Sequence, residues 1–230
     1  MYGLMKELSA EERPYERCEK YGVSALSDVE LLSVLLRNGT GKKGVLELAA
    51  EVLNRCGPGK SIGHLSNLSL KELREIKGIG RVKAIELLCL CEFSRRMWRQ
   101  RYKAGFKVKD ASDAAGYFME ELRYKDEENV CILLLNAKNI VIGDFLMTRG
   151  TASSSPVAVR EILKKSLTMD AVKVILIHNH PSGDPAPSAA DVETASLLKK
   201  AMALVGIVLL DSIIIGDGVY YSFQEEEIVF

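Results

Sequence analysis

Long apolar runs, a secretion signal and a disulfide framework are all missing from this sequence of 230 residues. No stretch approaches the roughly 18 consecutive apolar residues of a membrane-spanning helix, and the first residues do not join a basic segment to an apolar one as a signal peptide does. The five cysteines are odd in number and lie mostly among apolar residues, which is typical of reduced thiols in the cytoplasm. We therefore expect a cytoplasmic protein without a membrane partner.

Histidine is also scarce, since the chain has three, and two of them lie close together at His178 and His180. They follow an apolar run over 172–177 that is typical of a buried strand. Alternate side chains of a strand point to the same face, so both imidazoles converge and Asn179 points away. The Pro-Ser-Gly-Asp-Pro segment after His180 predicts a turn that ends the strand.

A carboxylate returns to this strand end from the helix that is predicted to begin at Ser188, because Asp191 lies in its first turn. Two histidine nitrogens and one carboxylate oxygen form a three-ligand zinc set with an open fourth position, which is typical of a catalytic site. The sequence therefore predicts one zinc ion per chain, held by His178, His180 and Asp191. Ser188 and Asp191 also form a Ser-x-x-Asp pattern close to a capping box, which explains these two residues without a metal.

The formal net charge of zero hides two opposite halves. Residues 1–103 carry 19 Lys and Arg against 13 Asp and Glu, a net charge of +6, and residues 104–230 carry 12 against 18, a net charge of −6. The basic stretch at 95–103 has the composition of a linker. We therefore expect two domains with different partners, a small all-α domain over 1–103 and an α/β domain over 104–230.

In the first domain, a Gly-Ile-Gly turn at 78–80 separates two predicted helices, the second of which spans 82–98. This arrangement resembles a helix-hairpin-helix, a module that often binds nucleic-acid backbones. Gly78 and Gly80 let backbone N–H groups approach a phosphate at the start of the second helix. Three basic residues flank the turn, namely Lys77, Arg81 and Lys83. The hairpin predicts salt-sensitive DNA binding without sequence specificity, and the alternative is a tight turn between packed helices.

The second domain alternates predicted helices with predicted strands. We expect helices over 112–122, 157–167 and 188–204, and strands over 130–135, 140–148, 172–177, 208–215 and 219–223. Ser112 and Asp113 are expected to cap the first of these helices. This order of elements predicts a mixed sheet covered by helices.

The string His178-Asn-His-Pro-Ser-Gly-Asp-Pro-Ala-Pro-Ser-Ala-Ala-Asp191 resembles the JAMM motif of the JAB/MPN metallopeptidase superfamily, and the RadC family in particular. The resemblance covers nearly the whole chain, and its other matching segments are Arg13-Pro14, Tyr21-Gly22, Leu26-Ser27-Asp28, Glu30-Leu31-Leu32, Leu36-Arg37-Asn38-Gly39-Thr40, Gly150-Thr151 and Arg160-Glu161. It implies the MPN fold for the second domain, a three-layer arrangement with a mixed α+β sheet that is similar to cytidine deaminases.

The resemblance also implies roles for residues outside the ligand set. A peptidase needs a carboxylate that is not a ligand, to take a proton and pass it to the leaving amine. In JAMM enzymes this Glu lies upstream, at the start of a sheet strand. Glu128 matches that place best, Glu127 beside it points the other way, and Glu161 on a following helix is the alternative. The family pattern also gives Ser188 a second role, which is to stabilise the oxyanion of the tetrahedral intermediate.

These features predict a zinc metallopeptidase that cleaves a peptide or isopeptide bond of a peptide or protein substrate by zinc-activated water. A metal-dependent nuclease or phosphoesterase is a second interpretation, which needs further ligands, and Asp184 is the obvious nearby candidate. The third interpretation is a DNA-associated protein of repair or recombination whose metal site is structural or vestigial. The intact ligand set favours an enzyme, and the remaining histidine, His64, stands alone in the helical half.

Overall fold

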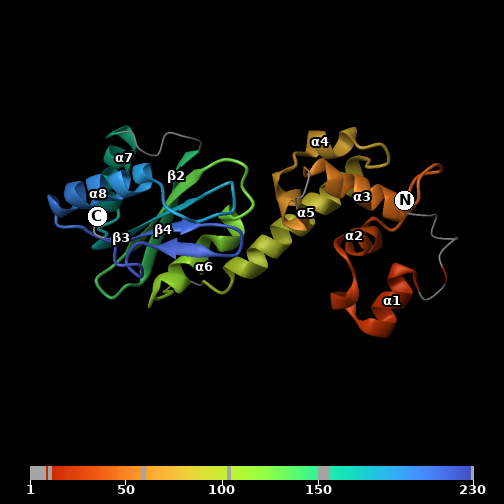
Figure 1. Cartoon of the computed structure of the whole chain (residues 1–230), viewed down its shortest axis with the longest axis horizontal. Helices are drawn as coiled ribbons and strands as arrows, with labels where there is room; N and C mark the ends of the chain where they lie inside the picture. Colours follow the sequence, from red (N-terminus) through yellow and green to blue (C-terminus); the bar gives the residue numbers. More distant parts are fainter. Residues whose placement is uncertain (1–8, 10–11, 58–60, 103–104, 150–155, 229–230) are drawn as a thin grey trace. The chain divides into compact units, whose positions relative to one another are not determined.

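The computed structural model describes residues 9, 12–57, 61–102, 105–149 and 156–228. The chain divides into two compact units, Met1–Ser94 and Arg95–Phe230. The first unit is helical, and the second contains a five-stranded sheet with helices (Figure 1). The second unit begins at Arg95, the first residue of the basic stretch that the sequence marks as a linker. The predicted fold class, a helical region followed by a mixed α/β domain, is confirmed.

The first unit consists of short helices around one apolar core. Their bounds are α1 (Pro14–Tyr21), η2 (Val23–Ala25), α2 (Asp28–Leu36), α3 (Val45–Arg55), η3 (Ile62–Asn67), α4 (Leu70–Glu75) and α5 (Arg81–Arg99), which continues into the second unit. Complete capping boxes begin α2 at Ser27 and α4 at Ser69, because each serine is followed three residues later by a glutamate. Leu32, Leu48 and Leu73 are fully buried in the core of this unit.

The second unit carries a mixed sheet in the strand order β2-β1-β3-β4-β5, in which only the β3–β4 pair is parallel. The strands are β1 (Asn129–Leu135), β2 (Val141–Arg149), β3 (Lys173–Asn179), β4 (Val208–Ile215) and β5 (Tyr220–Ser222), and the helices are α6 (Ala111–Leu122), α7 (Pro156–Thr168) and α8 (Ala189–Ala203). The parallel β3–β4 connection passes through α8, as such a crossover requires.

The two faces of the sheet bury alternate residues against different helices. Cys131, Leu133 and Leu135 of β1 share a core with α6, whereas Val130, Ile132 and Leu134 share one with α7 and α8. Figure 1 shows α6 on one face of the sheet and α7 and α8 on the other. Because side chains alternate along a strand, residue 178 of β3 shares the face of Val174 and Leu176 and points toward the layer that contains α8.

The predicted helices and strands of the second domain are all confirmed, with ends that coincide or differ by one or two residues. One shift matters for the site, because β3 extends to Asn179 and places His178 inside the strand. The predicted cap of α6 is wrong, since Asp110 is its N-cap and accepts the N–H of Asp113 at 2.9 Å. Ser112 lies within the first turn and donates its hydroxyl to the same carboxylate. Among the described helices, none is long and apolar enough to span a membrane.

Candidate metal centre

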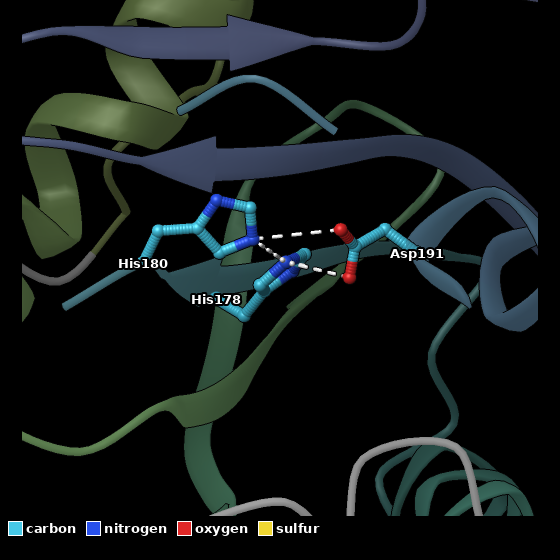
Figure 2. Close-up of side chains that lie close together, drawn as sticks. All are labelled: His178, His180 and Asp191. Atoms are coloured by element: carbon cyan, nitrogen blue, oxygen red, sulfur yellow. Dashed lines mark hydrogen bonds and ion pairs between the residues drawn. The ribbon is translucent and has the colours of Figure 1, made fainter. Parts of the chain in front are cut away.

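Three side chains from two elements point toward one another at the end of β3 (Figure 2). The Nε2 atoms of His178 and His180 lie 3.3 Å apart, and Asp191 places Oδ1 at 3.2 Å from the first nitrogen and Oδ2 at 3.4 Å from the second. Ligand atoms about 2.0–2.1 Å from a tetrahedral zinc ion lie roughly 3.3–3.4 Å from each other. Each carboxylate oxygen of Asp191 faces a different imidazole, and one ligand atom from each of the three residues lies within 4.8 Å of the others, close enough for a single ion. The predicted convergence of the two imidazoles is confirmed.

The backbone around the histidines is fixed by the centre of the sheet. His178 pairs with Val130 of β1 and with Ile214 of β4, and its side chain is buried. His180 lies one residue beyond the strand, where its N–H donates to the carbonyl of Ile215 at 3.0 Å. Both histidines therefore lie on hydrogen-bonded backbone rather than on a free loop, and such support is what a metal site needs.

The ring of His180 is oriented by the turn that follows it. Its Nδ1 lies 2.9 Å from the backbone carbonyl of Asp184. A carbonyl only accepts hydrogen bonds, so Nδ1 carries a proton, and Nε2 is the ring nitrogen that faces His178 and Asp191. A metal-binding histidine usually has a partner of this kind, which fixes its tautomer. Asp184, the candidate ligand of a second metal ion, contributes its carbonyl to His180, and its carboxylate Oδ1 accepts the N–H of Ala186.

Asp191 serves as a helix cap and faces the histidines at the same time. Its Oδ2 accepts hydrogen bonds from the Ser188 N–H at 2.7 Å and from the Ser188 hydroxyl at 2.6 Å, and Ser188 Oγ accepts the N–H of Asp191. Burial opposes ionisation of this carboxyl, but hydrogen bonds from His178 and Ser188 outweigh it and hold its pKa well below its usual range. The capping box and the ligand set are therefore compatible, and Asp191 is ready to bind a cation as a carboxylate.

Ser188 is exposed, and its hydroxyl is engaged in this cap. To stabilise an oxyanion, the hydroxyl has to turn from Asp191 toward the substrate. The oxyanion role of Ser188 therefore stays a prediction that depends on substrate binding.

Glu128 lies directly before β1 and lines a narrow pocket with two of the candidate ligands, His178 and Asp191. Glu128 lies two residues before Val130, and alternate residues of a strand point to the same face of the sheet. Since Val130 pairs with His178, Glu128 and His178 lie on the same face. The pocket is lined by Glu128, Val130, Val159, Ile162, Leu176, His178, Asp191, Thr194 and Leu198. Glu128 and Asp191 are the acidic residues in this lining, as far as the described part of the chain shows.

The two other glutamates lie elsewhere. Glu127 is exposed, and Glu161 on α7 forms a 4.0 Å ion pair with Lys164. Neither lines the pocket among the residues that the structure describes. The position of Glu128 therefore favours it as the base, and its catalytic role remains a prediction.

The hairpin of the first unit is anchored by Ile79, which is 2% exposed. Gly78 has a φ of 110°, and an added Cβ would lie 2.4 Å from Thr40 Cγ2, so the fold itself requires this glycine. Gly80 is exposed, and a Cβ there would meet nothing within 4 Å. Packing and the positive φ therefore explain why residue 78 is a glycine, whereas no steric contact explains why residue 80 is one.

The basic residues around this turn differ in their surroundings. Lys77 and Arg81 are exposed, whereas Lys83 is half-buried and donates its ammonium to the carbonyl of Asn38. Lys83 therefore serves the fold of the first unit, and Lys77 and Arg81 are the exposed charges that remain for a partner.

Two family models match the chain. One described as "RadC-like JAB domain" matches residues 108–228, and one described as "UPF0758 N-terminal" matches residues 5–85. A UPF0758 protein of Clostridium botulinum (strain Loch Maree / Type A3) is 42% identical over 226 residues, which is 96% of each chain. A UPF0758 protein of Desulforamulus reducens is 39% identical over 228 residues, which is 99% of each chain. Since the similarity extends over both units and nearly the full length, this chain belongs to the RadC family of UPF0758 proteins.

Proposed function

We propose that this chain is a zinc-dependent metallopeptidase that hydrolyses a peptide or isopeptide bond in a peptide or protein substrate. The observation that carries the proposal is the 3.2–3.4 Å spacing of the donor atoms of His178, His180 and Asp191. Two imidazoles and a carboxylate without a thiolate suit a catalytic zinc ion with an open position. Zinc, when bound, polarises the scissile carbonyl and lowers the pKa of a coordinated water toward about 7.

The residues around the ligands supply proton transfer, oxyanion stabilisation and the orientation of His180. Glu128 lies at the pocket beside the ligands, where it accepts the proton of the attacking water and returns it to the leaving amine. Ser188 supplies a hydroxyl donor for the developing oxyanion once substrate displaces it from Asp191. The Asp184 carbonyl keeps His180 in the tautomer that can bind a metal.

A single metal ion is better supported than the pair that a two-metal nuclease needs. The cluster found among the described residues contains His178, His180 and Asp191. Asp184, the candidate for a second site, uses its carboxylate within its own turn. This arrangement favours amide hydrolysis at one ion over two-metal phosphoester hydrolysis.

The full chain loaded with zinc tests the proposal on a defined mixture of unstructured peptides and of lysine-linked isopeptides. Mass spectrometry in ¹⁸O-labelled water identifies each new carboxyl end. We expect cleavage that stops when zinc is chelated and returns when zinc is restored. Zinc-loaded protein that cleaves no amide but hydrolyses a phosphodiester would overturn the proposal.

We also propose that the α4–α5 turn binds the backbone of nucleic acid. The supporting observation is that Lys77, Gly80 and Arg81 are all exposed around the buried anchor Ile79. Exposed cations beside the start of a helix suit phosphate groups. This second function is independent of the zinc site and is tested separately below.

A further inference from the structure

Asn179 lies between the two histidine ligands in sequence, yet its side chain is fully buried and binds another part of the chain. Its Oδ1 accepts the backbone N–H of Asn129 at 2.9 Å, and its Nδ2 donates to the carbonyl of Glu127 at 3.2 Å. The side chain of Asn129 donates to the same carbonyl at 2.6 Å. These hydrogen bonds hold the backbone on both sides of Glu128.

The ladder between β1 and β3 explains why a side chain is needed here. The paired register of these strands ends at Val130 and His178. Beyond that pair, the amide of Asn179 supplies the acceptor that a neighbouring strand would otherwise provide to Asn129. A buried backbone N–H group without an acceptor is destabilising, so without Asn179 the start of β1 is expected to loosen. Glu128 lies in this short segment.

We propose that Asn179 is a positioning residue that fixes Glu128 relative to His178 and His180. The inference rests on the metallopeptidase function proposed above, with Glu128 as the base. One short planar amide offers the acceptor for Asn129 and the donor for Glu127 together, and no other side chain of this size does. Because Asn179 belongs to the same strand end as the ligands, one residue sets the distance between the base and the metal-binding nitrogens.

The first test is a double-mutant cycle in the full-length zinc-loaded protein. Asn179→Leu keeps a similar volume and removes both hydrogen bonds. We expect kcat to fall about 10- to 100-fold, with KM within about twofold and one zinc per chain retained. In a Glu128→Gln background, the same substitution should lower the residual rate by less than about twofold, because the positioned group is already disabled.

Two control variants separate positioning from general damage. Asn129→Ala removes one of the three hydrogen bonds and keeps both made by Asn179, so its loss of kcat should be only a few-fold. Ser222→Ala removes a buried hydrogen bond to Asp211 on β4 and should leave kcat unchanged. Equal losses from Asn179→Leu with and without Glu128, or loss of zinc from that variant, would overturn the inference.

The second test does not depend on turnover. Amide hydrogen exchange in Asn179→Leu should accelerate about tenfold or more at Asn129, while the amides of β4 keep their protection. Unchanged exchange at Asn129 would overturn the inference even if the protein is an active peptidase. If exchange accelerates but the wild type cleaves no amide bond, the proposed peptidase function fails, whereas the role of Asn179 in holding the backbone around Glu128 is supported. Failure of the proposed function and failure of this inference are therefore distinguishable.

Discussion

The second unit gathers its functional side chains around one point, whereas the basic side chains of the α4–α5 turn in the first unit face solvent. His178, His180 and Asp191 are held within hydrogen-bonding distance of one another by a central strand and a helix start. Lys77 and Arg81 remain exposed beside a buried Ile79. Convergent donors of fixed spacing suit a single ion of defined geometry, and exposed cations suit an extended polyanion.

The largest effect that sharpens this comparison is expected from Glu128→Gln. The variant keeps the ligands but loses the base, so amide hydrolysis should fall about 10²- to 10⁴-fold at unchanged zinc content. The rate of peptide cleavage measures it. Glu127→Gln is the matched control, because Glu127 is adjacent and exposed, and it should retain the wild-type rate. Full activity of zinc-bound Glu128→Gln would transfer the role of base to another residue.

Zinc should stabilise one unit and not the other. A ligand at a free concentration of a thousand times its Kd adds roughly 4 kcal/mol to the free energy of unfolding. We expect that gain at the amides of β3 and α8, measured by hydrogen exchange, and no gain in α3. His180→Ala should abolish the gain. Equal stabilisation of both units by zinc would contradict a site confined to the second unit.

Gly78 and Gly80 should respond differently to alanine, because one serves the fold and the other is open to solvent. Gly78→Ala forces a Cβ against Thr40 at a positive φ, which should cost about 1–3 kcal/mol in the free energy of unfolding. Gly80→Ala should change that free energy by less than about 0.5 kcal/mol. Chemical denaturation of the full chain measures both. Should Gly80→Ala also weaken DNA binding without loss of stability, its role at the backbone of DNA is supported.

The smallest effect concerns charge in the first unit. Lys77→Gln combined with Arg81→Gln should reduce the slope of log affinity for DNA against log salt by about two and weaken binding at low salt. Zinc content and peptide cleavage should not change. Fluorescence anisotropy with a labelled duplex measures the slope. Absence of DNA binding by the wild-type chain at low salt would contradict the proposed nucleic-acid function.

The convergence of the candidate ligands was predictable because His178 lies on β3, His180 follows that strand directly and Asp191 lies in a capping box, so local sequence patterns place all three. The hydrogen bond of Lys83 to the carbonyl of Asn38 could not be predicted from the sequence. The two residues are 45 positions apart, and only the packing of the helices brings them together. The hydrogen bonds of Asn179 that hold the backbone on both sides of Glu128 could not be predicted for the same reason. Asn179 and Asn129 are 50 residues apart, and the register of β1 against β3 decides that they meet. Local pattern thus predicts which candidate ligands converge, and tertiary register decides what holds them.

Elemental analysis of bound metal tests the central claim most directly. We would measure it in the zinc-supplied wild type, in His180→Ala, in Asp191→Ala and in His64→Ala as a control from the helical unit. The account predicts one zinc per chain in the wild type and in His64→Ala, and loss of zinc in the other two variants. A wild type without zinc, or full zinc retention in Asp191→Ala, would contradict it, and the Ser188–Asp191 pair would then be a helix cap alone.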